Sequence, residues 1–316
     1  MSITLFWDGL LEASDYLKGD EVMFGGLRPW GMHAGNILTL VAYPYLLFEQ
    51  MEKMGKKPRF KYYITLNDWE PARLAFPKGK EFEHNVYPVD TSFEYTLDVE
   101  GCHKSIVDHV EGPTREKFKI IRKDFPGVDL AFVRNSELKE NPLFMKMIGI
   151  TIKDSKRIAE IIRDSTGRPV LTDEAQYAGA VCPSCKSSQG KTLFENGVVS
   201  YECSACGNAS SGKLGSFDYW CYHIPLFAAR VPSLKIAFAI RGLDHYETKR
   251  IHAGRDILNY YFPDTGFPRN LIAPMLIAGD GQKMSKTRGN ALDMDTISII
   301  KACRGNKSEN IKVESV

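Results

Sequence analysis

The stretch EVMFGGLRPWGMHAGNILTLVAYPYLLFEQMEKMGKK, residues 21–57, decides the fold. Its first residues are mostly apolar and lead into a turn rich in glycine and proline. After the turn, apolar residues recur at helical spacing until Gly55 and the lysines that follow it. The stretch therefore predicts a strand, a Gly/Pro turn and a helix.

A second strand is predicted in RFKYYITLND, residues 59–68, where aromatic and β-branched residues dominate. Two strands with a helix between them form a right-handed βαβ unit of a parallel sheet. Further along, LKIAFAIRG (234–242) reads as a buried strand, DHYETKRIHAGRDILNYYF (244–262) as one helix, and NLIAPMLIAGDG (270–281) as a strand or hairpin. The predicted fold class is α/β, a Rossmann-type doubly wound parallel sheet with a helical insertion and a zinc-ribbon insertion.

Changes in composition divide the chain into five parts. Residues 1–103 form the first half of the Rossmann domain, 104–167 a helical connective region, and 168–212 a ribbon in which Cys, Gly and Ser replace helical periodicity. Residues 213–300 form the second half of the Rossmann domain, and 301–316 a tail.

Composition bounds the partners and the compartment. The 316 residues are 43% hydrophobic and 25% charged, with a formal net charge of +2, which is too small to indicate a nucleic-acid partner by itself. The N-terminus lacks a basic start and an apolar block, and no apolar run approaches the roughly 20 residues that span a bilayer. We therefore expect a cytoplasmic protein with no membrane partner, in which the seven cysteines are not paired in disulfides.

Four cysteines form the strongest single motif. Cys182 and Cys185 make one CxxC pair, and Cys203 and Cys206 make a second. Two such pairs at this separation favour a tetrahedral, structural zinc site on two hairpins over four unrelated thiols, because four thiolates close the coordination sphere. Cys102, Cys221 and Cys303 lack such partners and are expected to be core or incidental residues.

Two weaker motifs are predicted at the edge of the sheet where a doubly wound fold binds nucleotides. In RPWGMHAGN, His33, Gly35 and Asn36 lie at the turn after the first strand, where a helix N-terminus favours phosphate. In IRGLDHYE, Gly242, Asp244 and His245 follow a buried strand. Each has a structural alternative: a hydrogen-bonding histidine at a turn, and Asp244 as a helix N-cap.

A third motif, GDGQKMSKTRGN (279–290), combines lysines with glycines. The alternatives are a solvated surface loop or a phosphate clamp, since ammonium groups and exposed backbone amides bind phosphate oxygens.

Together HAGN and KMSKT resemble the two signature motifs of class I aminoacyl-tRNA synthetases, and most of residues 20–295 resemble class I lysyl-tRNA synthetases. ITLNDWEPAR, KLGSFDYW, GLDH and the four cysteines are similar to segments of that family. The resemblance implies activation of an amino acid with ATP and Mg²⁺ on a Rossmann-type fold.

Carried over to this sequence, the resemblance implies a role for each motif. His33, Asn36, Lys283 and Lys286 are the implied catalytic residues. ATP contacts are implied for these four and for Gly35, Gly242, Asp244, Met284 and Ser285. The amino-acid pocket is implied at Trp30, Trp220, Asp244 and His245.

Two departures from the family pattern open alternatives. Trp30 stands where the family carries a small hydroxyl residue, which changes the pocket and leaves the amino acid open. The chain ends at Val316, so we expect a ligase without an anticodon-binding domain, whose tRNA contacts involve the acceptor stem. Alternatives are a paralogue that ligates the activated amino acid to a small molecule, carrier protein or modified base, and a non-catalytic binding paralogue. The oligomeric state is unknown.

Overall fold

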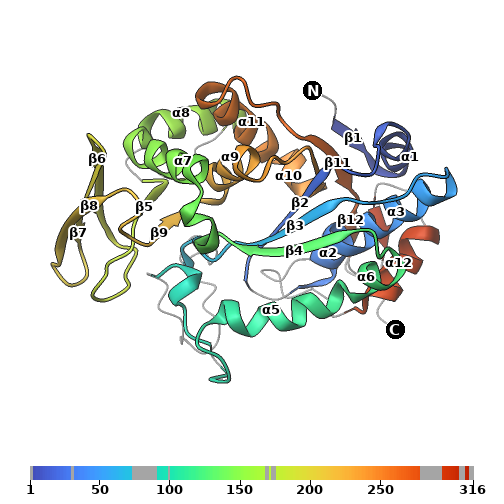
Figure 1. The fold of residues 1–316 in the computed structure, drawn as a ribbon, viewed down its shortest axis with the longest axis horizontal. Coiled ribbons are helices and arrows are strands. Elements are labelled where there is room, and N and C mark those ends of the chain that lie inside the picture. The colour runs from blue at the N-terminus through green and yellow to red at the C-terminus, as the bar shows by residue number, and fades with distance from the viewer. Residues whose placement is uncertain are drawn as a thin grey trace.

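The computed structural model describes residues 3–29, 32–72, 91–98, 100–167, 171, 176–277, 294–305 and 310–312. Its centre is a six-stranded parallel sheet in the order β1-β11-β10-β2-β3-β4 (Figure 1). The strands are β1 (Ile3–Leu5), β2 (Val22–Leu27), β3 (Lys61–Leu66), β4 (Asp129–Arg134), β10 (Phe238–Gly242) and β11 (Arg269–Ala273). The predicted Rossmann-type doubly wound sheet is confirmed.

The strand order reverses between β2 and β10. From β2 the chain builds outward through β3 and β4 on one side, and then returns to add β10 and β11 on the other. In open α/β sheets, ligands bind outside the carboxyl ends of the strands at such a switch point. A ligand site is therefore expected at the segments that follow β2 and β10.

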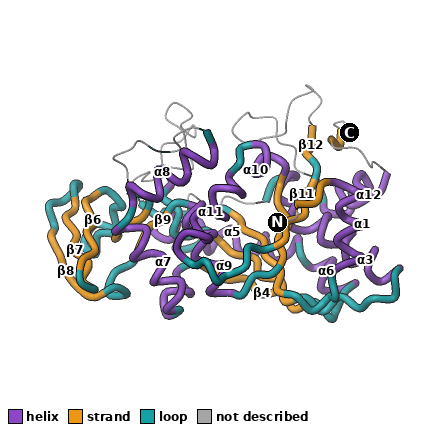
Figure 2. Tube along the Cα trace, turned by 90° about the horizontal axis from the view of Figure 1, so that it is seen from above, coloured by secondary structure: helices purple, strands orange, loops and turns teal. Residues whose placement is uncertain are grey.

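Helices cover both faces of the sheet (Figure 2). One face packs against α1 (Phe6–Tyr16), α2 (Ala34–Ile37), the π-helical η1 (Leu38–Ala42), α3 (Tyr43–Lys53), α5 (Ile106–Lys117), α6 (Lys119–Asp124) and α12 (Thr296–Gly305). The other packs against α7 (Pro142–Lys153), α8 (Ser155–Thr166), α9 (His223–Leu234) and α11 (Arg250–Tyr261). Strand residues alternate between the two cores, as Met23 and Phe24 do.

The cysteine-rich segment forms antiparallel strands at one end of the molecule (Figure 1). β6 (Gly190–Glu195), β7 (Val198–Cys203) and β8 (Ala209–Lys213) make one sheet, and β5 (Ala178–Ala180) pairs with β9 (Tyr219–Cys221). Asn196 and Gly197 join β6 to β7 with φ of 49° and 81°, as a tight two-residue hairpin turn requires.

Several elements differ from the sequence-based expectation. The single helix expected over 244–262 is wrong: α10 (Leu243–Glu247) and α11 are separate, because Lys249 takes a left-handed φ of 54°. β12 (Met275–Ile277) pairs in parallel with β13 (Asn310–Lys312). β1 and α1 were not predicted. Short 3₁₀ turns lie at η2 (Phe93–Tyr95) and η3 (Ser136–Glu140). None of the described helices combines the length and apolarity that crossing a membrane needs.

Candidate active site

The turn after β2 holds His33 and Asn36 in a reciprocal cap at the start of α2. The backbone N–H of Gly35 donates to Nδ1 of His33 at 3.0 Å, and the N–H of His33 donates to Oδ1 of Asn36 at 3.4 Å. An accepting Nδ1 places the proton of the neutral ring on Nε2. The cap thus orients His33 as a donor at the N-terminus of a helical segment that continues to Lys53.

Two glycines make this arrangement sterically feasible. A Cβ at Gly35 would lie 2.9 Å from Cε1 of His33, so a side chain there would displace the imidazole. A Cβ at Gly25 would lie 2.6 Å from Cδ2 of Leu40, so β2 and the helical segment could not approach as closely. The hydroxyl of Tyr62 donates to the Leu40 carbonyl at 2.8 Å. This segment is therefore fixed against the strand.

The end of β10 meets the same helical segment. Gly242 is the N-cap residue of α10, and Asp244 lies in its first turn, so the structural alternative of Asp244 as the N-cap does not hold. A Cβ at Gly242 would lie 2.6 Å from Oδ1 of Asp244 and 3.7 Å from Oγ1 of Thr39 in η1. The Asp244 carboxylate thus lies beside the end of the strand, and the two predicted motifs meet at the switch point.

His245 lies in a positively charged environment. Burial, together with the charges of Arg241, His223 and Arg250, lowers the pKa of its imidazole to about 3, against the opposing effect of Asp244. The ring is therefore neutral near pH 7, and it can donate or accept one hydrogen bond with each nitrogen.

Sequence reasoning missed an ion pair at the carboxyl ends of β2 and β3. Glu70 is fully buried and accepts hydrogen bonds from Nε and Nη2 of Arg28 at 2.7 and 2.6 Å. Nδ1 of His223 lies 3.3 Å from Glu70. Burial by itself would raise the pKa of Glu70, but Arg28 and His223 outweigh it and hold that pKa well below its usual range. No local sequence signal marks the pair, because only the register of β2 and β3, in which Leu27 and Leu66 are partners, brings the two residues together.

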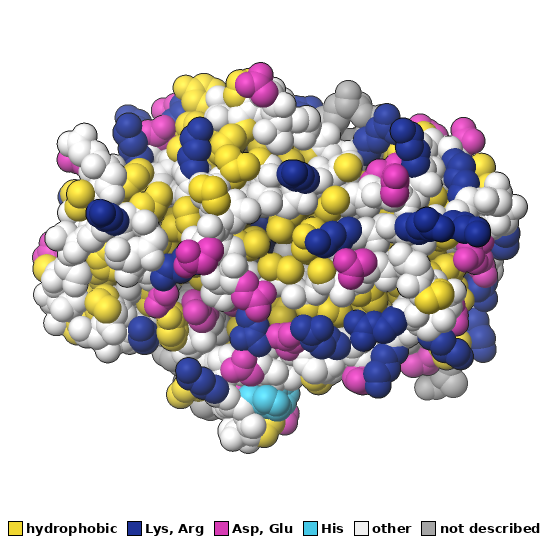
Figure 3. Space-filling view, in the orientation of Figure 1, with side chains coloured by type: hydrophobic (Ala, Val, Ile, Leu, Met, Phe, Trp, Pro, Cys, Tyr) yellow, Lys and Arg dark blue, Asp and Glu magenta, His cyan; other side chains and the backbone are white. Residues whose placement is uncertain are grey.

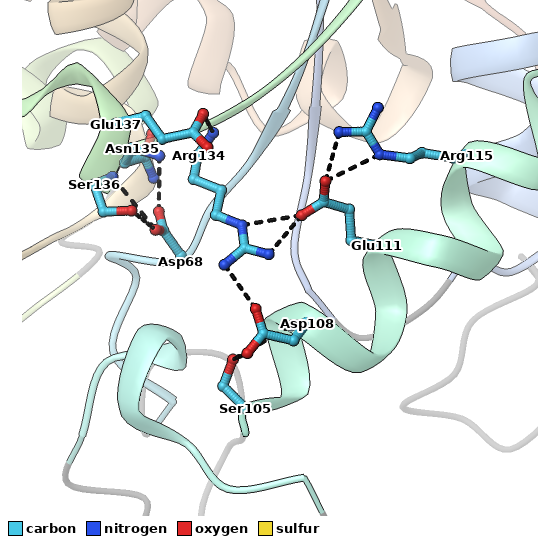
Figure 4. Close-up of polar contacts among 9 residues, drawn as sticks. All are labelled: Asp68, Ser105, Asp108, Glu111, Arg115, Arg134, Asn135, Ser136 and Glu137. Carbon is cyan, nitrogen blue, oxygen red and sulfur yellow. Dashed lines mark hydrogen bonds and ion pairs between the residues drawn. The ribbon is translucent and has the colours of Figure 1, made fainter. Parts of the chain in front are cut away.

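A second polar network ties β3 to β4 (Figure 4). The Asp68 carboxylate accepts from the backbone N–H of Asn135 at 2.8 Å and from the hydroxyl of Ser136 at 2.5 Å. Burial raises the pKa of Asp68 to about 6. In the same view Arg134 joins β4 to α5 through Asp108 at 2.8 Å and Glu111 at 2.6 Å. These contacts fix the edge of the sheet beside the candidate site.

The four predicted cysteines lie together at the ribbon. Sγ of Cys182 is 3.6 Å from Sγ of Cys206, Sγ of Cys185 is 3.6 Å from Sγ of Cys203, and all four sulfurs lie within 4.8 Å of one another. Zinc–sulfur bonds of about 2.3 Å in a tetrahedron place the sulfurs roughly 3.8 Å apart. The cluster fits a four-thiolate zinc site.

The expectation that Cys102 is a core or incidental residue is wrong, because it lies in a second cluster of potential metal ligands. It is exposed, and its Sγ lies 3.2 Å from Oδ2 of Asp98, 3.0 Å from Nδ1 of His103 and 3.3 Å from Nδ1 of His109. The four potential ligand atoms lie within 4.8 Å of one another. Histidine atoms reach the molecular surface at the end of the molecule where the loop before α5 lies (Figure 3). The sequence signal, Cys-His followed by His109, was missed because only paired cysteines were considered. Cys221 and Cys303 are buried, as expected.

The remaining predicted residues divide into two groups. Trp220 is buried on β9, where a Cβ at Gly179 would lie 2.8 Å from its Nε1. The next residue, Cys221, donates its backbone N–H to the carbonyl of Trp69 at 2.9 Å, which places Trp220 beside the segment that follows β3. The second group lies outside the described residues and consists of Trp30, Lys283, Met284, Ser285 and Lys286.

Solved structures of two synthetases resemble the chain at low identity. A Leishmania major tyrosyl-tRNA synthetase in complex with tyrosinol has a TM-score of 0.45 and 14% identity, over 91% of this chain and 32% of that one. A Campylobacter jejuni tryptophanyl-tRNA synthetase has a TM-score of 0.38 and 13% identity, over 89% of this chain and 67% of that one. The chain thus spans about a third of the length of the first. Neither similarity is high enough to indicate a substrate.

No curated protein matches the chain significantly. A family model does match, and it covers nearly the whole chain, residues 9–302; its description is tRNA synthetases class I (K). On that match, with the HAGN and GLDH segments following β2 and β10 at the switch point of the sheet, the chain belongs to the class I tRNA synthetase family.

Proposed function

We propose that this protein is a ligase that activates an amino acid with ATP, forms an aminoacyl-adenylate and transfers the aminoacyl group to an acceptor. The observation that carries the proposal is that Gly242 lies beside both Asp244 and Thr39, and that Thr39 belongs to the helical segment that His33 begins. This joins a helix N-terminus suited to phosphate with a second motif at one switch point.

The chemistry is an in-line displacement at the α-phosphorus of ATP. A carboxylate oxygen of the amino acid forms the new bond to phosphorus, and the bond to the bridging oxygen of pyrophosphate breaks. Such a reaction needs positioning and charge stabilisation more than a protein nucleophile. His33 would donate from Nε2 to a phosphate oxygen, and Asn36 would keep His33 in place. Gly35 and Gly242 would let the nucleotide approach the backbone.

Magnesium would enter with ATP and supply positive charge to the phosphate oxygens. Asp244 is the carboxylate at this edge that fits such an ion, since Mg²⁺ prefers oxygen ligands. His245, Trp220 and Trp30 would line the amino-acid pocket.

Lys283, Met284, Ser285 and Lys286 complete the proposed ATP site. Two ammonium groups on a glycine-rich loop would neutralise the departing pyrophosphate. Their role rests on the KMSKT motif.

We further propose zinc in both ligand clusters. The Cys182, Cys185, Cys203 and Cys206 set closes the coordination sphere with thiolates, as structural sites do. The Asp98, Cys102, His103 and His109 set offers one carboxylate, one thiolate and two imidazoles, all of which are zinc ligands. Each ion would stabilise a segment with little apolar core of its own.

The motif resemblance and the family description favour a ligase with the architecture of the lysyl enzymes. We propose that it acts in the cytoplasm and that its acceptor is tRNA, bound through the acceptor stem. The basic residues Lys119, Arg122 and Lys123 of α6 are exposed, and lysine and arginine side chains gather on the face of the molecule that Figure 3 shows. Such a surface suits phosphate contacts. A small molecule, a carrier protein or a modified base is the alternative acceptor.

Amino-acid-dependent ATP–pyrophosphate exchange, measured with each of the twenty amino acids and with or without total tRNA, tests the proposal. Exchange with one amino acid supports activation, and salt-sensitive tRNA binding supports the tRNA acceptor. An absence of exchange under every condition, with tight tRNA or nucleotide binding, would favour the non-catalytic paralogue.

A further inference from the structure

Arg241 is a cation without a matching anion at the candidate site. It lies one residue before Gly242 at the carboxyl end of β10. Its Nε and Nη2 atoms are closed to solvent and have no hydrogen-bond partner among the described residues. A buried guanidinium whose donors are unmet is costly, so a native site that keeps one has a use for it.

Two neighbouring arginines show how this edge of the sheet satisfies a guanidinium. Arg28 binds the Glu70 carboxylate through two nitrogens. Arg230 is buried and donates to Oδ1 of Asn135 from Nε at 2.9 Å, and to Oδ1 of Asn67. Arg241 has no corresponding acceptor within the described residues, although it lies in the same polar region.

Aromatic rings hold the Arg241 guanidinium in one orientation. Its Cζ lies 4.0 Å from the ring centroid of Phe227 in α9 and 4.9 Å from that of Phe24 in β2. Rings at these distances restrict the planar group and leave its edge, which carries the N–H donors, for a ligand. A fixed guanidinium edge matches the two oxygens of a carboxylate.

The electrostatics fit a protonated cation with no protein partner. Burial and the like charge of Arg230 together lower the pKa of Arg241 to about 9, against the opposing effect of Tyr62. The group remains charged at pH 7. An ammonium placed beside it would be repelled, whereas a carboxylate would be attracted.

The place of Arg241 in the fold separates it from the proposed phosphate site. Phe24 and Phe227 belong to the core between the sheet and α9, whereas Ala34 and Ile37 of α2 pack on the opposite face. Gly26 lies two residues after Phe24 in β2, so its position belongs to the same face of the sheet. Because it is a glycine, no side chain occupies that position beside β10. The unmatched guanidinium therefore faces the side away from the helix that would hold ATP.

Resting on the amino-acid activation proposed above, we infer that Arg241 is a specificity residue and that the amino acid activated here carries a carboxylate in its side chain. The substrate class is then an acidic amino acid, not lysine. Arg241 would bind the side-chain carboxylate with two N–H donors, and the α-carboxylate would remain for attack on ATP.

The test compares the wild type with Arg241→Gln and Arg241→Lys in pyrophosphate exchange with glutamate, aspartate, their amides and lysine. The wild type should use an acidic amino acid in preference to its amide. Arg241→Gln should raise the KM for that amino acid by roughly 10- to 100-fold while the KM for ATP stays within about twofold, and Arg241→Lys should retain part of the affinity. Arg115→Gln is the matched control, because Arg115 also lies over a phenylalanine ring, 4.4 Å from the Phe132 centroid, but is paired with Glu111.

The outcomes separate this inference from the proposed function. Exchange with lysine or a neutral amino acid, unchanged in specificity by Arg241→Gln, would overturn the inference and leave the function standing. If no amino acid supports exchange, calorimetric titration with glutamate and aspartate decides. Binding by the wild type that is lost in Arg241→Gln would support the anion site while the activity fails. No binding of either by the wild type would overturn the inference.

Discussion

The carboxylate of Glu70 and the guanidinium of Arg28 face each other with two hydrogen bonds, 2.7 Å from Nε and 2.6 Å from Nη2, across the ends of adjacent strands. Glu70 is fully buried, whereas 39% of the Arg28 side chain is exposed. The pair therefore neutralises Arg28 and joins the ends of β2 and β3. Among the described residues of this edge, Arg241 is thus the arginine with buried guanidinium donors that lack a partner.

Glu70→Gln should destabilise the protein by roughly 2–4 kcal/mol, because it leaves the Arg28 charge without its partner. The measurement is the free energy of unfolding in urea. Glu49→Gln is the matched control, since it weakens only the more exposed pairs with Arg304, at 2.5 Å, and Lys53, at 3.4 Å, which should cost less than about 1 kcal/mol. Equal losses in both variants would show that the buried pair does not stabilise the fold.

Elemental analysis should find two zinc ions in each chain. Cys203→Ser should remove one ion and unfold the ribbon of β6, β7 and β8, while the second ion and the central sheet persist. His109→Ala should remove the other ion and leave the ribbon intact. A wild-type protein free of zinc after expression in zinc-supplemented medium would show that neither cluster binds this metal.

His33→Ala should lower the rate of adenylate formation by about 100-fold, as loss of one donor to developing phosphate charge typically does. The thermal midpoint should decrease only slightly, since the lost cap is one hydrogen bond to Gly35. Stopped-flow or quench measurements with saturating substrates give the rate. A rate equal to that of the wild type would exclude His33 from the mechanism.

Lys283→Ala and Lys286→Ala should each reduce adenylate formation by orders of magnitude while circular dichroism and the melting temperature stay unchanged. The reason is loss of the positive charge proposed to stabilise the pyrophosphate. Arg288→Ala, in the same segment but outside the two lysine positions, is the comparison. Wild-type rates of adenylate formation in both lysine variants would show that the segment has no role in the reaction.

The buried imidazole of His223 should make the free energy of unfolding depend on pH. Burial lowers the pKa of its imidazole from 6.5 to about 4, with Glu70 opposing the shift. Between these values the unfolded chain binds a proton that the folded chain does not, so the unfolding free energy falls as the pH falls through this window. His223→Gln removes this contribution, and urea titrations should show a smaller loss for the variant between pH 6.5 and about 4. Parallel curves would indicate that His223 titrates normally in the folded protein.

The positions of three strands and of two motifs could be predicted from sequence because they depend on local patterns. Apolar runs marked β2, β3 and β10, and the glycines around His33 and Asp244 marked the turns at their ends. Both signals can be recognised because an apolar run and the turn residues after it are neighbours in the sequence.

The pairings between distant residues could not be predicted in the same way. Arg28 and Glu70 are 42 positions apart, and only the register of β2 and β3 brings them together. Arg241 interrupts an otherwise apolar strand, which was a visible signal, but its lack of an acceptor depends on how Phe24 and Phe227 pack. The four potential ligands Asp98, Cys102, His103 and His109 come together only because the loop before α5 lies against the first turn of that helix.

The most direct test of amino-acid activation is to identify the products of ATP in a single turnover. ATP labelled at the α-phosphate is mixed with excess enzyme and each of the twenty amino acids, and the quenched products are separated. Activation predicts labelled aminoacyl-adenylate or AMP together with one pyrophosphate for each ATP consumed, in the presence of the cognate amino acid only. Formation of ADP and inorganic phosphate, or no consumption of ATP with any amino acid, would contradict it.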